Sequence, residues 1–169
     1  NIDKIHTLGQ LRESDYHSQG VKSEMRENLI DALKSGQTLF KPIKGYEDSV
    51  IPHLENAILS RHNIILLGLR GQAKTRLSRL MVDLLDEYVP VIDQSELNDD
   101  PFHPLSSFGR DRIQEAGEDT PISWLHRDER YIEKLATPDV SVADLIGNLD
   151  PIKGAALRLT YADERVIDY

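Results

Sequence analysis

The feature that most constrains this chain is the stretch NIILLGLRGQAKTRLSRL, which runs from Asn63 to Leu80. Its beginning, Asn63 to Leu67, is a compact apolar run without apolar/polar alternation, which predicts a parallel strand buried on both faces. A glycine-containing turn follows, and a helical pattern of apolar residues begins at Leu77 and continues to about Tyr88. Strand, turn and helix in this order indicate an α/β layered fold.

The turn, GLRGQAKT, matches the pattern G-x-x-x-x-[G/A]-K-[S/T] at Gly68, Ala73, Lys74 and Thr75, with a further glycine, Gly71, inside it. Average residue frequencies give such a match by chance in about one or two per cent of chains of this length. Glycines let the backbone wrap so that N–H groups converge on phosphate oxygens. A lysine at this position reaches the β- and γ-phosphates, and the adjacent hydroxyl binds Mg²⁺. We therefore expect the backbone amides from Arg70 to Thr75 to surround a polyphosphate, with the N-terminus of the next helix directed at it.

Ala73 departs from the usual pattern, which has glycine at this position. Glycine is obligatory only where φ must be positive or where a methyl group would collide with the ligand. We expect Ala73 to adopt right-handed helical dihedral angles, in which alanine is unstrained. On that expectation the loop closes around phosphate with alanine in place.

The charge distribution supports an anionic ligand at the loop. The 169-residue chain has a formal net charge of -9, so it has no general basic face for nucleic acid or a membrane surface. Yet Asp and Glu are absent from Asn56 through Val82. The cations around this acid-free window are Arg61, Arg70, Lys74, Arg76 and Arg79. A cation-rich patch in an acidic chain suits a polyphosphate.

The rest of the chain is consistent with one α/β domain over residues 21–169, preceded by a loosely ordered segment over residues 1–20. Apolar spacing predicts a helix from Ser23 that is capped at Gly36, and a second helix from Val50 to Leu59. Val89 to Ile92 is expected to form a short strand.

Residues 94–130 form a long insertion, which is more typical of a functional or interacting segment than of a plain connection. Within it, NDDPFHPLSS is expected to be a loop, in which Asp99 and Asp100 shape a turn before Pro101. LSSFGRDRIQEAG predicts a short helix and PISWLH a strand. YIEKLAT, after the insertion, is a third strand candidate.

Three stretches resemble the MoxR and magnesium-chelatase branch of the AAA+ ATPases. GLRGQAKT resembles the G-x-x-G-x-A-K-[S/T] loop frequent in MoxR-type proteins, in which alanine is usual. IKGYEDSVIPHLENAIL resembles their G-Q-E segment and following helix, with Tyr46 in place of glutamine. ATPDVSVADLIGNLD resembles the run that leads into an insert in the second AAA+ helix. The resemblance extends from about Lys44 to Asp150.

The resemblance implies a P-loop NTPase fold of three αβα layers with a parallel sheet, and an insert over residues 148–169. Family members bind ATP and Mg²⁺, form rings that are commonly hexamers, and remodel or load partners, often proteins with a von Willebrand A-type domain. Gly45 and Tyr46 would lie beside the adenine. Lys74 would be the catalytic lysine and Thr75 the metal ligand. The remaining nucleotide contacts would come from Gly68, Arg70, Gly71, Gln72, Ala73 and Arg76.

Hydrolysis also requires a Walker B strand ending in Asp-Glu, which holds Mg²⁺ and activates water. Val91-Ile92-Asp93 is a weak mimic, because Gln94 replaces the glutamate and the segment follows the loop helix too soon. We expect a part of a longer ATPase that binds ATP and does not hydrolyse it alone. Two alternatives remain: a non-hydrolysing regulatory or scaffold module, and, less favoured, a P-loop kinase or transferase.

Other residue clusters in the sequence are weaker indicators of function. The six histidines form no pair at metal-ligand spacing, and the charged run HRDERYIEK is typical of a solvated face. Trp124 and Phe108 are expected to pack in the insertion. Asp144 and Asp150 resemble positions of the family's run, and capping the segments after them is an equally good role. The chain has no cysteine, which is compatible with the cytoplasm, where we expect the protein.

Overall fold

The computed structural model describes residues 2–135, 137–146, 148–149 and 167–168. The chain divides into two compact units, which we treat separately. The first unit contains the described residues of Asn1–Asp15, Pro90–Ser123 and Ile132–Tyr169. The second unit contains Tyr16–Val89 and Trp124–Tyr131. The candidate loop lies in the second unit.

Three helices build the second unit: α2 (Val21–Lys34), α3 (Val50–Leu59) and α4 (Lys74–Leu80), the last continued by the 3-10 helix η2 (Met81–Leu84). The helix predictions from Ser23 and Val50 are thereby confirmed. Their inward faces meet in one core. The buried residues of this core are Leu29, Phe40, Ile43, Leu54, Ile58, Leu77 and Leu84. Apolar residues at helical spacing predicted these helices, because each helix must bury one apolar stripe of its surface in the core.

Both α2 and α3 end in a Schellman motif, in which a left-handed residue lets two N–H groups satisfy carbonyls of the last turn. After α2, Gly36 has φ 69° and the Gln37 N–H donates to the Ala32 carbonyl at 2.9 Å. After α3, Arg61 takes the same role with φ 56°, and the His62 N–H donates to the Ala57 carbonyl at 3.0 Å. The second motif ends α3 directly before the segment that leads to the loop.

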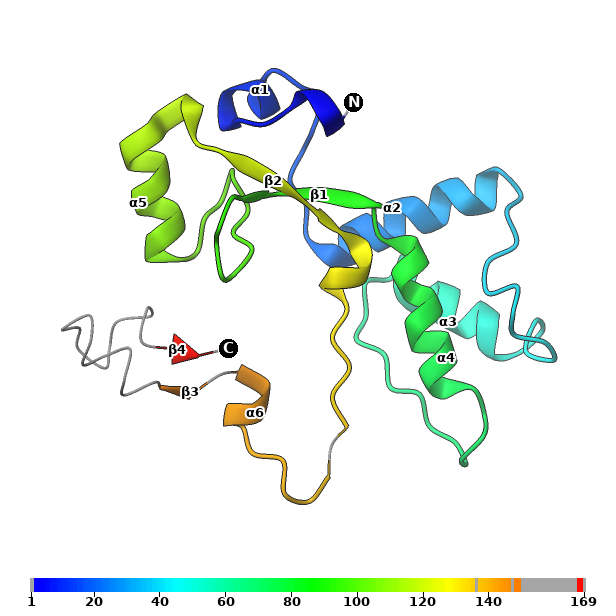
Figure 1. The fold of residues 1–169 in the computed structure, drawn as a ribbon. Helices are drawn as coiled ribbons and strands as arrows, with labels where there is room; N and C mark the ends of the chain where they lie inside the picture. The colour runs from blue at the N-terminus through cyan, green and yellow to red at the C-terminus, as the bar shows by residue number, and fades with distance from the viewer. Residues whose placement is uncertain (1, 136, 147, 150–166, 169) are drawn as a thin grey trace. The chain divides into compact units, whose positions relative to one another are not determined.

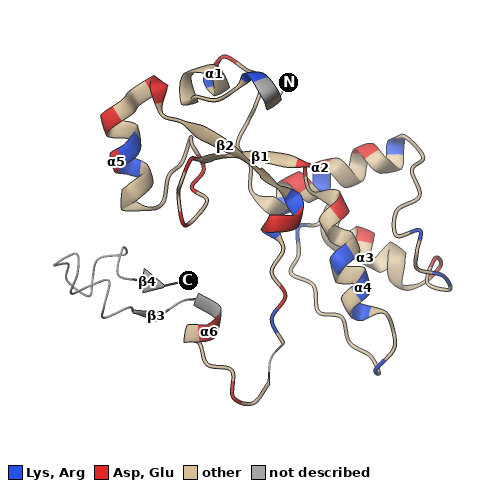
Figure 2. Ribbon diagram, viewed as in Figure 1, with Lys and Arg blue, Asp and Glu red and all other residues tan. Residues whose placement is uncertain are grey.

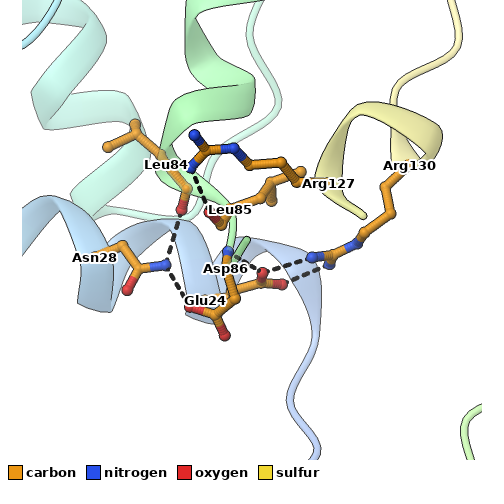
Figure 3. Close-up of polar contacts among 7 residues, drawn as sticks. All are labelled: Glu24, Asn28, Leu84, Leu85, Asp86, Arg127 and Arg130. Carbon is orange, nitrogen blue, oxygen red and sulfur yellow. Dashed lines mark hydrogen bonds and ion pairs between the residues drawn. The ribbon is translucent and has the colours of Figure 1, made fainter. Parts of the chain in front are cut away.

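A buried ion pair holds the 3-10 helix η4 (Arg127–Arg130) on α2 (Figure 3). The Glu24 side chain is only 2% exposed, and both its oxygens accept from the Arg130 guanidinium at 2.6 Å. Hydrogen bonding to Glu24 raises the pKa of Arg130 above its ordinary value. The run HRDERYIEK is therefore solvated at Asp128 and Glu129, as predicted, but not at Arg130.

Glu24 and Asn28 of α2 also bind the end of η2 and the residues that follow it. The Asp86 N–H donates to Glu24 Oε1 at 2.7 Å, and Asn28 Nδ2 donates to the Leu84 carbonyl at 3.0 Å and to Asp86 Oδ1 at 2.8 Å. Breaking such a pair by removing one partner leaves an uncompensated buried charge. The end of η2 and the end of η4 are thus held on α2 (Figure 3).

Two predicted strands are confirmed and pair with each other: β1 (Tyr88–Ile92) and β2 (Ile122–His126). Hydrogen bonds from the Asp93 N–H to the Pro121 carbonyl and from the Arg127 N–H to the Glu87 carbonyl flank the pairing, so the strands run antiparallel. The second described sheet pairs β3 (Asn148–Leu149) with β4 (Ile167–Asp168), also antiparallel. These two strands lie within the expected insert over 148–169; residues 150–166 and 169 lie outside the described residues.

The predicted strands Asn63 to Leu67 and Tyr131 to Thr137 need correction, because their described residues form no regular element. In the first, Ile64 and Leu66 pack on the core, whereas Ile65 and Leu67 are 82% and 88% exposed. Only one face is covered, and no hydrogen bond of a sheet joins it to another described segment. The parallel sheet of the P-loop fold remains a prediction.

The first unit begins with 3-10 helix η1 (Ile2–Lys4) and helix α1 (Leu8–Arg12). The prediction of a loose segment over residues 1–20 is wrong for this part, because Leu8 and Leu11 are fully buried. The Thr7 hydroxyl caps α1, and the Leu8 N–H donates to the Thr120 carbonyl at 2.9 Å. Helix α1 is too short for a periodic signal, so its burial was not apparent from spacing.

The insertion contains helix α5 (Ser107–Ala116), as predicted, followed by the 3-10 helix η3 (Gly117–Asp119). Before α5 lies the Asp99 loop, which we define as Asp93–Ser106. Asp99 is buried and accepts from the N–H groups of Leu105 and Ser106 at 2.7 and 2.8 Å, and from the Ser95 hydroxyl at 2.7 Å. The Ser106 hydroxyl also donates to Asp99 and caps α5.

The predicted turn before Pro101 is confirmed at Asp100, whose side chain accepts from the Phe102 N–H at 2.9 Å. Phe108 on α5 is 38% exposed and Trp124 is half-buried. A short helix, α6 (Ala143–Ile146), follows the extended segment after η4. Within the described residues, no helix has the length and apolar character needed to cross a membrane.

Candidate functional site

The Gly68–Thr75 loop connects the extended segment after α3 to the start of α4 (Figure 1). The helix begins at Lys74, one turn before the first apolar residue of its pattern at Leu77. The predicted end near Tyr88 is wrong, because α4 ends at Leu80, η2 ends at Leu84 and Tyr88 already belongs to β1. Leu77 of α4 is buried in the core, and the Leu77 N–H donates to the Ala73 carbonyl at 2.9 Å. The core therefore holds the C-terminal end of the loop, while its tip at Arg70 is exposed.

The backbone of the loop alternates between positive and negative φ. Gly71 has φ 81° and Ala73 has φ 53° and ψ 17°, whereas Gln72 and Lys74 are not among the positive-φ residues. Such alternation aims successive N–H groups at one point and forms a nest that binds anions. The prediction of right-handed dihedral angles for Ala73 is wrong. Alanine here has a left-handed conformation that costs about 1 kcal/mol.

The N–H groups of this nest are available to a ligand. Within the described part of the chain, no acceptor takes the backbone N–H groups from Arg70 to Thr75. Backbone donors of proteins are nearly always paired with protein groups or with water. A run of unpaired donors in a backbone of alternating φ can therefore bind an anion with several hydrogen bonds at once.

Two side chains of the loop turn back onto its beginning. Lys74 Nζ donates to the carbonyls of Gly68 at 2.8 Å and Leu69 at 2.5 Å, and Gln72 Oε1 accepts from the Leu69 N–H at 2.9 Å. The Lys74 ammonium therefore lies beside the loop, within reach of an anion in the nest. Charge-assisted bonds to phosphate are stronger than its bonds to neutral carbonyls.

A cavity of about 580 Å³ adjoins the loop. It falls within the range of about 300–1,000 Å³ typical of small-molecule sites. Its lining is Tyr46, Val50, His53, Leu54, Ala57, Asn63, Ile64, Ile65, Leu66, Leu67, Gln72, Lys74 and Leu77. The structure thus brings Tyr46, predicted beside the base, to the same cavity as Gln72 and Lys74 of the loop. Most of the other lining residues are apolar, which suits the face of an aromatic base.

The remaining predicted residues do not line this cavity. Arg70, Thr75 and Arg76 are exposed, as are Gly68 and Gly71, while Ala73 is half-buried against the core. Gly45 is exposed with φ 84°. The blue ribbon segments in Figure 2 mark Lys and Arg positions on α4 and at the tip of the preceding loop. The Thr75 hydroxyl is thus accessible to a cation held by a phosphate in the nest.

Sequence reasoning missed two polar residues of the cavity, His53 and Asn63. His53 lies on α3 one turn after Val50 and one turn before Ala57, and all three line the cavity. The spacing of α3 could have placed His53 on this stripe. Asn63 gave no such signal, because it lies at the start of an extended segment.

Outside the loop, the described residues hold no group of three His, Cys, Asp or Glu side chains that could bind a metal ion. Asp144 accepts from the N–H and hydroxyl of Ser141, at 2.8 and 2.7 Å, and these bonds lower the pKa of Asp144. It therefore bonds the residues before α6 rather than capping a following segment. Asp150 lies outside the described residues.

We compared the chain with models of known protein families, with curated proteins and with solved structures, and none of them matched.

Proposed function

We propose that the chain is the Mg²⁺·ATP-binding part of a AAA+ ATPase of the MoxR and magnesium-chelatase type. The observation that carries this proposal is the run of unpaired N–H groups from Arg70 to Thr75 in a backbone of alternating φ. Together with the adjoining lysine, hydroxyl and cavity, it suits a nucleotide polyphosphate better than an isolated anion.

In this proposal the N–H groups bind the α- and β-phosphates, Lys74 leaves the carbonyls of Gly68 and Leu69 for the β- and γ-phosphates, and Thr75 ligates Mg²⁺. The base enters the cavity beside Tyr46. The resemblance to the family extends the proposal to a parallel-sheet αβα core, a hexameric ring, a cytoplasmic location and a protein partner with a von Willebrand A-type domain.

Titration with a fluorescent ATP analogue, mant-ATP, tests the proposal. We expect saturable binding that Mg²⁺ strengthens, and a Lys74→Ala protein that binds about 10- to 100-fold more weakly, the range for losing hydrogen bonds to a charged group. Lys22→Ala is the matched control, because Lys22 is an exposed lysine of the same unit on α2. Unchanged affinity of Lys74→Ala would refute the proposed site.

A second measurement separates binding from hydrolysis. We expect no Mg²⁺-dependent release of phosphate from ATP by this chain, because the sequence contains no Asp-Glu Walker B strand. Turnover that is lost in Lys74→Ala would show that the chain itself holds the missing catalytic groups.

A further inference from the structure

The side chain of Gln72 has a defined task within the loop. Gln72 is exposed, yet its Oε1 accepts the Leu69 N–H at 2.9 Å. The amide oxygen also lies over Gly68, where a Cβ would come within 2.1 Å of it. Gly68 has φ 154°, a value that favours glycine, so the backbone favours glycine here, and a Cβ at this position would displace the Gln72 amide.

The Leu69 residue is held from both sides. Gln72 takes its N–H, and the Lys74 ammonium takes its carbonyl at 2.5 Å. Both holding residues belong to the half of the loop that the core anchors through Ala73 and Leu77. The Leu69 side chain is 77% exposed and packs little, so these polar contacts position this residue.

We infer that Gln72 is a positioning residue of the proposed nucleotide site, and that its side-chain amide braces Leu69 so that the nest stays open to phosphate. This inference rests on the proposed function. Among the N–H groups from Leu69 to Thr75, that of Leu69 is the one bound by a side chain. When phosphate draws Lys74 away from the Leu69 carbonyl, the Gln72 contact is the one that still ties Leu69 to the anchored half of the loop. Because this contact orders Leu69 before the ligand binds, less conformational entropy is lost when the complex forms.

Gln72→Met and Gln72→Glu test the brace. Methionine keeps the length of the side chain and removes the acceptor, whereas glutamate keeps the acceptor and adds a negative charge. We expect the Leu69 amide proton to exchange with solvent faster in Gln72→Met and at the wild-type rate in Gln72→Glu. Exchange of the Leu77 and Leu84 amide protons in the core should stay unchanged in both proteins. Faster exchange at these two residues would indicate that the unit unfolds.

Binding of mant-ATP with Mg²⁺ gives the second readout. We expect Gln72→Met to bind about three- to tenfold more weakly than the wild type, the range for one intramolecular hydrogen bond. Gln37→Met is the matched control, because Gln37 is exposed in the same unit and lies outside the loop. It should bind as the wild type does.

Two results would overturn the inference while leaving the proposed function intact: wild-type affinity in Gln72→Met, or unchanged Leu69 exchange in that protein. Failure of the wild-type chain to bind mant-ATP would instead refute the proposed function. In that case faster Leu69 exchange in Gln72→Met would mean that the brace serves only the fold, and the inference would fail with the function.

Discussion

The Gly68–Thr75 loop and the Asp99 loop both precede a helix, but they treat their backbone donors in opposite ways. In the Asp99 loop, the N–H groups of Leu105 and Ser106 bind the buried Asp99 carboxylate. In the Gly68–Thr75 loop, the donors from Arg70 onward have no acceptor within the described residues. The Asp99 loop supplies its own anion, while the Gly68–Thr75 loop leaves its donors for an anion that binds from outside.

This difference separates a structural loop from a binding loop on physical grounds. An internal carboxylate satisfies the donors permanently, so the Asp99 loop has no use for a ligand at that point. Its burial raises the pKa of Asp99, but hydrogen bonds from Ser106, Ser95 and Leu105 lower that pKa by more, so the carboxylate stays ionised. Four predictions test the contrast, from the largest expected effect to the smallest.

Asp99→Ala should lower the free energy of unfolding of the first unit by about 3 kcal/mol, because it leaves the buried Ser106 N–H, the partly buried Leu105 N–H and two hydroxyls without their acceptor. Urea unfolding followed by circular dichroism measures the loss, and faster exchange of the Leu105 and Ser106 amides locates it. Affinity for mant-ATP should not change, and a large loss of affinity would contradict the separation of roles.

Thr75→Ala should remove most of the strengthening of mant-ATP binding by Mg²⁺, an effect of about tenfold or 1.4 kcal/mol, while binding in EDTA stays near the wild-type value. Thr75→Ser is the control, because it keeps the hydroxyl. If Thr75→Ala responded to Mg²⁺ as Thr75→Ser does, Thr75 would not be the metal ligand.

Acid should weaken the Asp99 loop. Because the pKa of Asp99 in the folded chain lies below its ordinary 3.8, ionised Asp99 contributes stability above pH 3.8 that is lost as the pH falls through the folded value. The wild type should therefore lose more stability than Asp99→Asn as the pH falls below about 4, and the difference between them should be constant above about pH 5. Urea midpoints measured across pH 2–7 check this, and parallel curves would contradict it.

Ala73→Gly should have the smallest effect. Glycine removes the left-handed strain of about 1 kcal/mol, but it loses the packing of the methyl group on the core and gains freedom in the unfolded chain. These contributions offset each other, so the melting temperature should shift by only a few degrees and mant-ATP affinity should stay within about twofold. Ala73→Val is the contrast, because a β-branched residue is an outlier at positive φ and should weaken binding markedly.

Helices α2, α3 and α5 and strands β1 and β2 were predictable because their signals are local. Apolar spacing and Gly36 placed α2, the same spacing placed α3, and α5, β1 and β2 followed from short stretches of sequence. The candidate site was predictable in its residues but not in its geometry. The motif indicated Lys74 and Thr75, yet it gave Ala73 the wrong backbone region and left His53 and Asn63 out of the cavity.

The sequence by itself determined helices α2 and α3 and which residues form the loop, since caps and helical spacing act between neighbours in the chain. Tertiary structure alone decided that Glu24 pairs with Arg130 across 106 positions, and that the Asn63–Leu67 segment is covered on one face only. It also decided the positive φ of Ala73, which brings its methyl group against the core while the nest opens to solvent. Burial and long-range pairing set these outcomes, and no local pattern of residue types specifies which distant groups will meet.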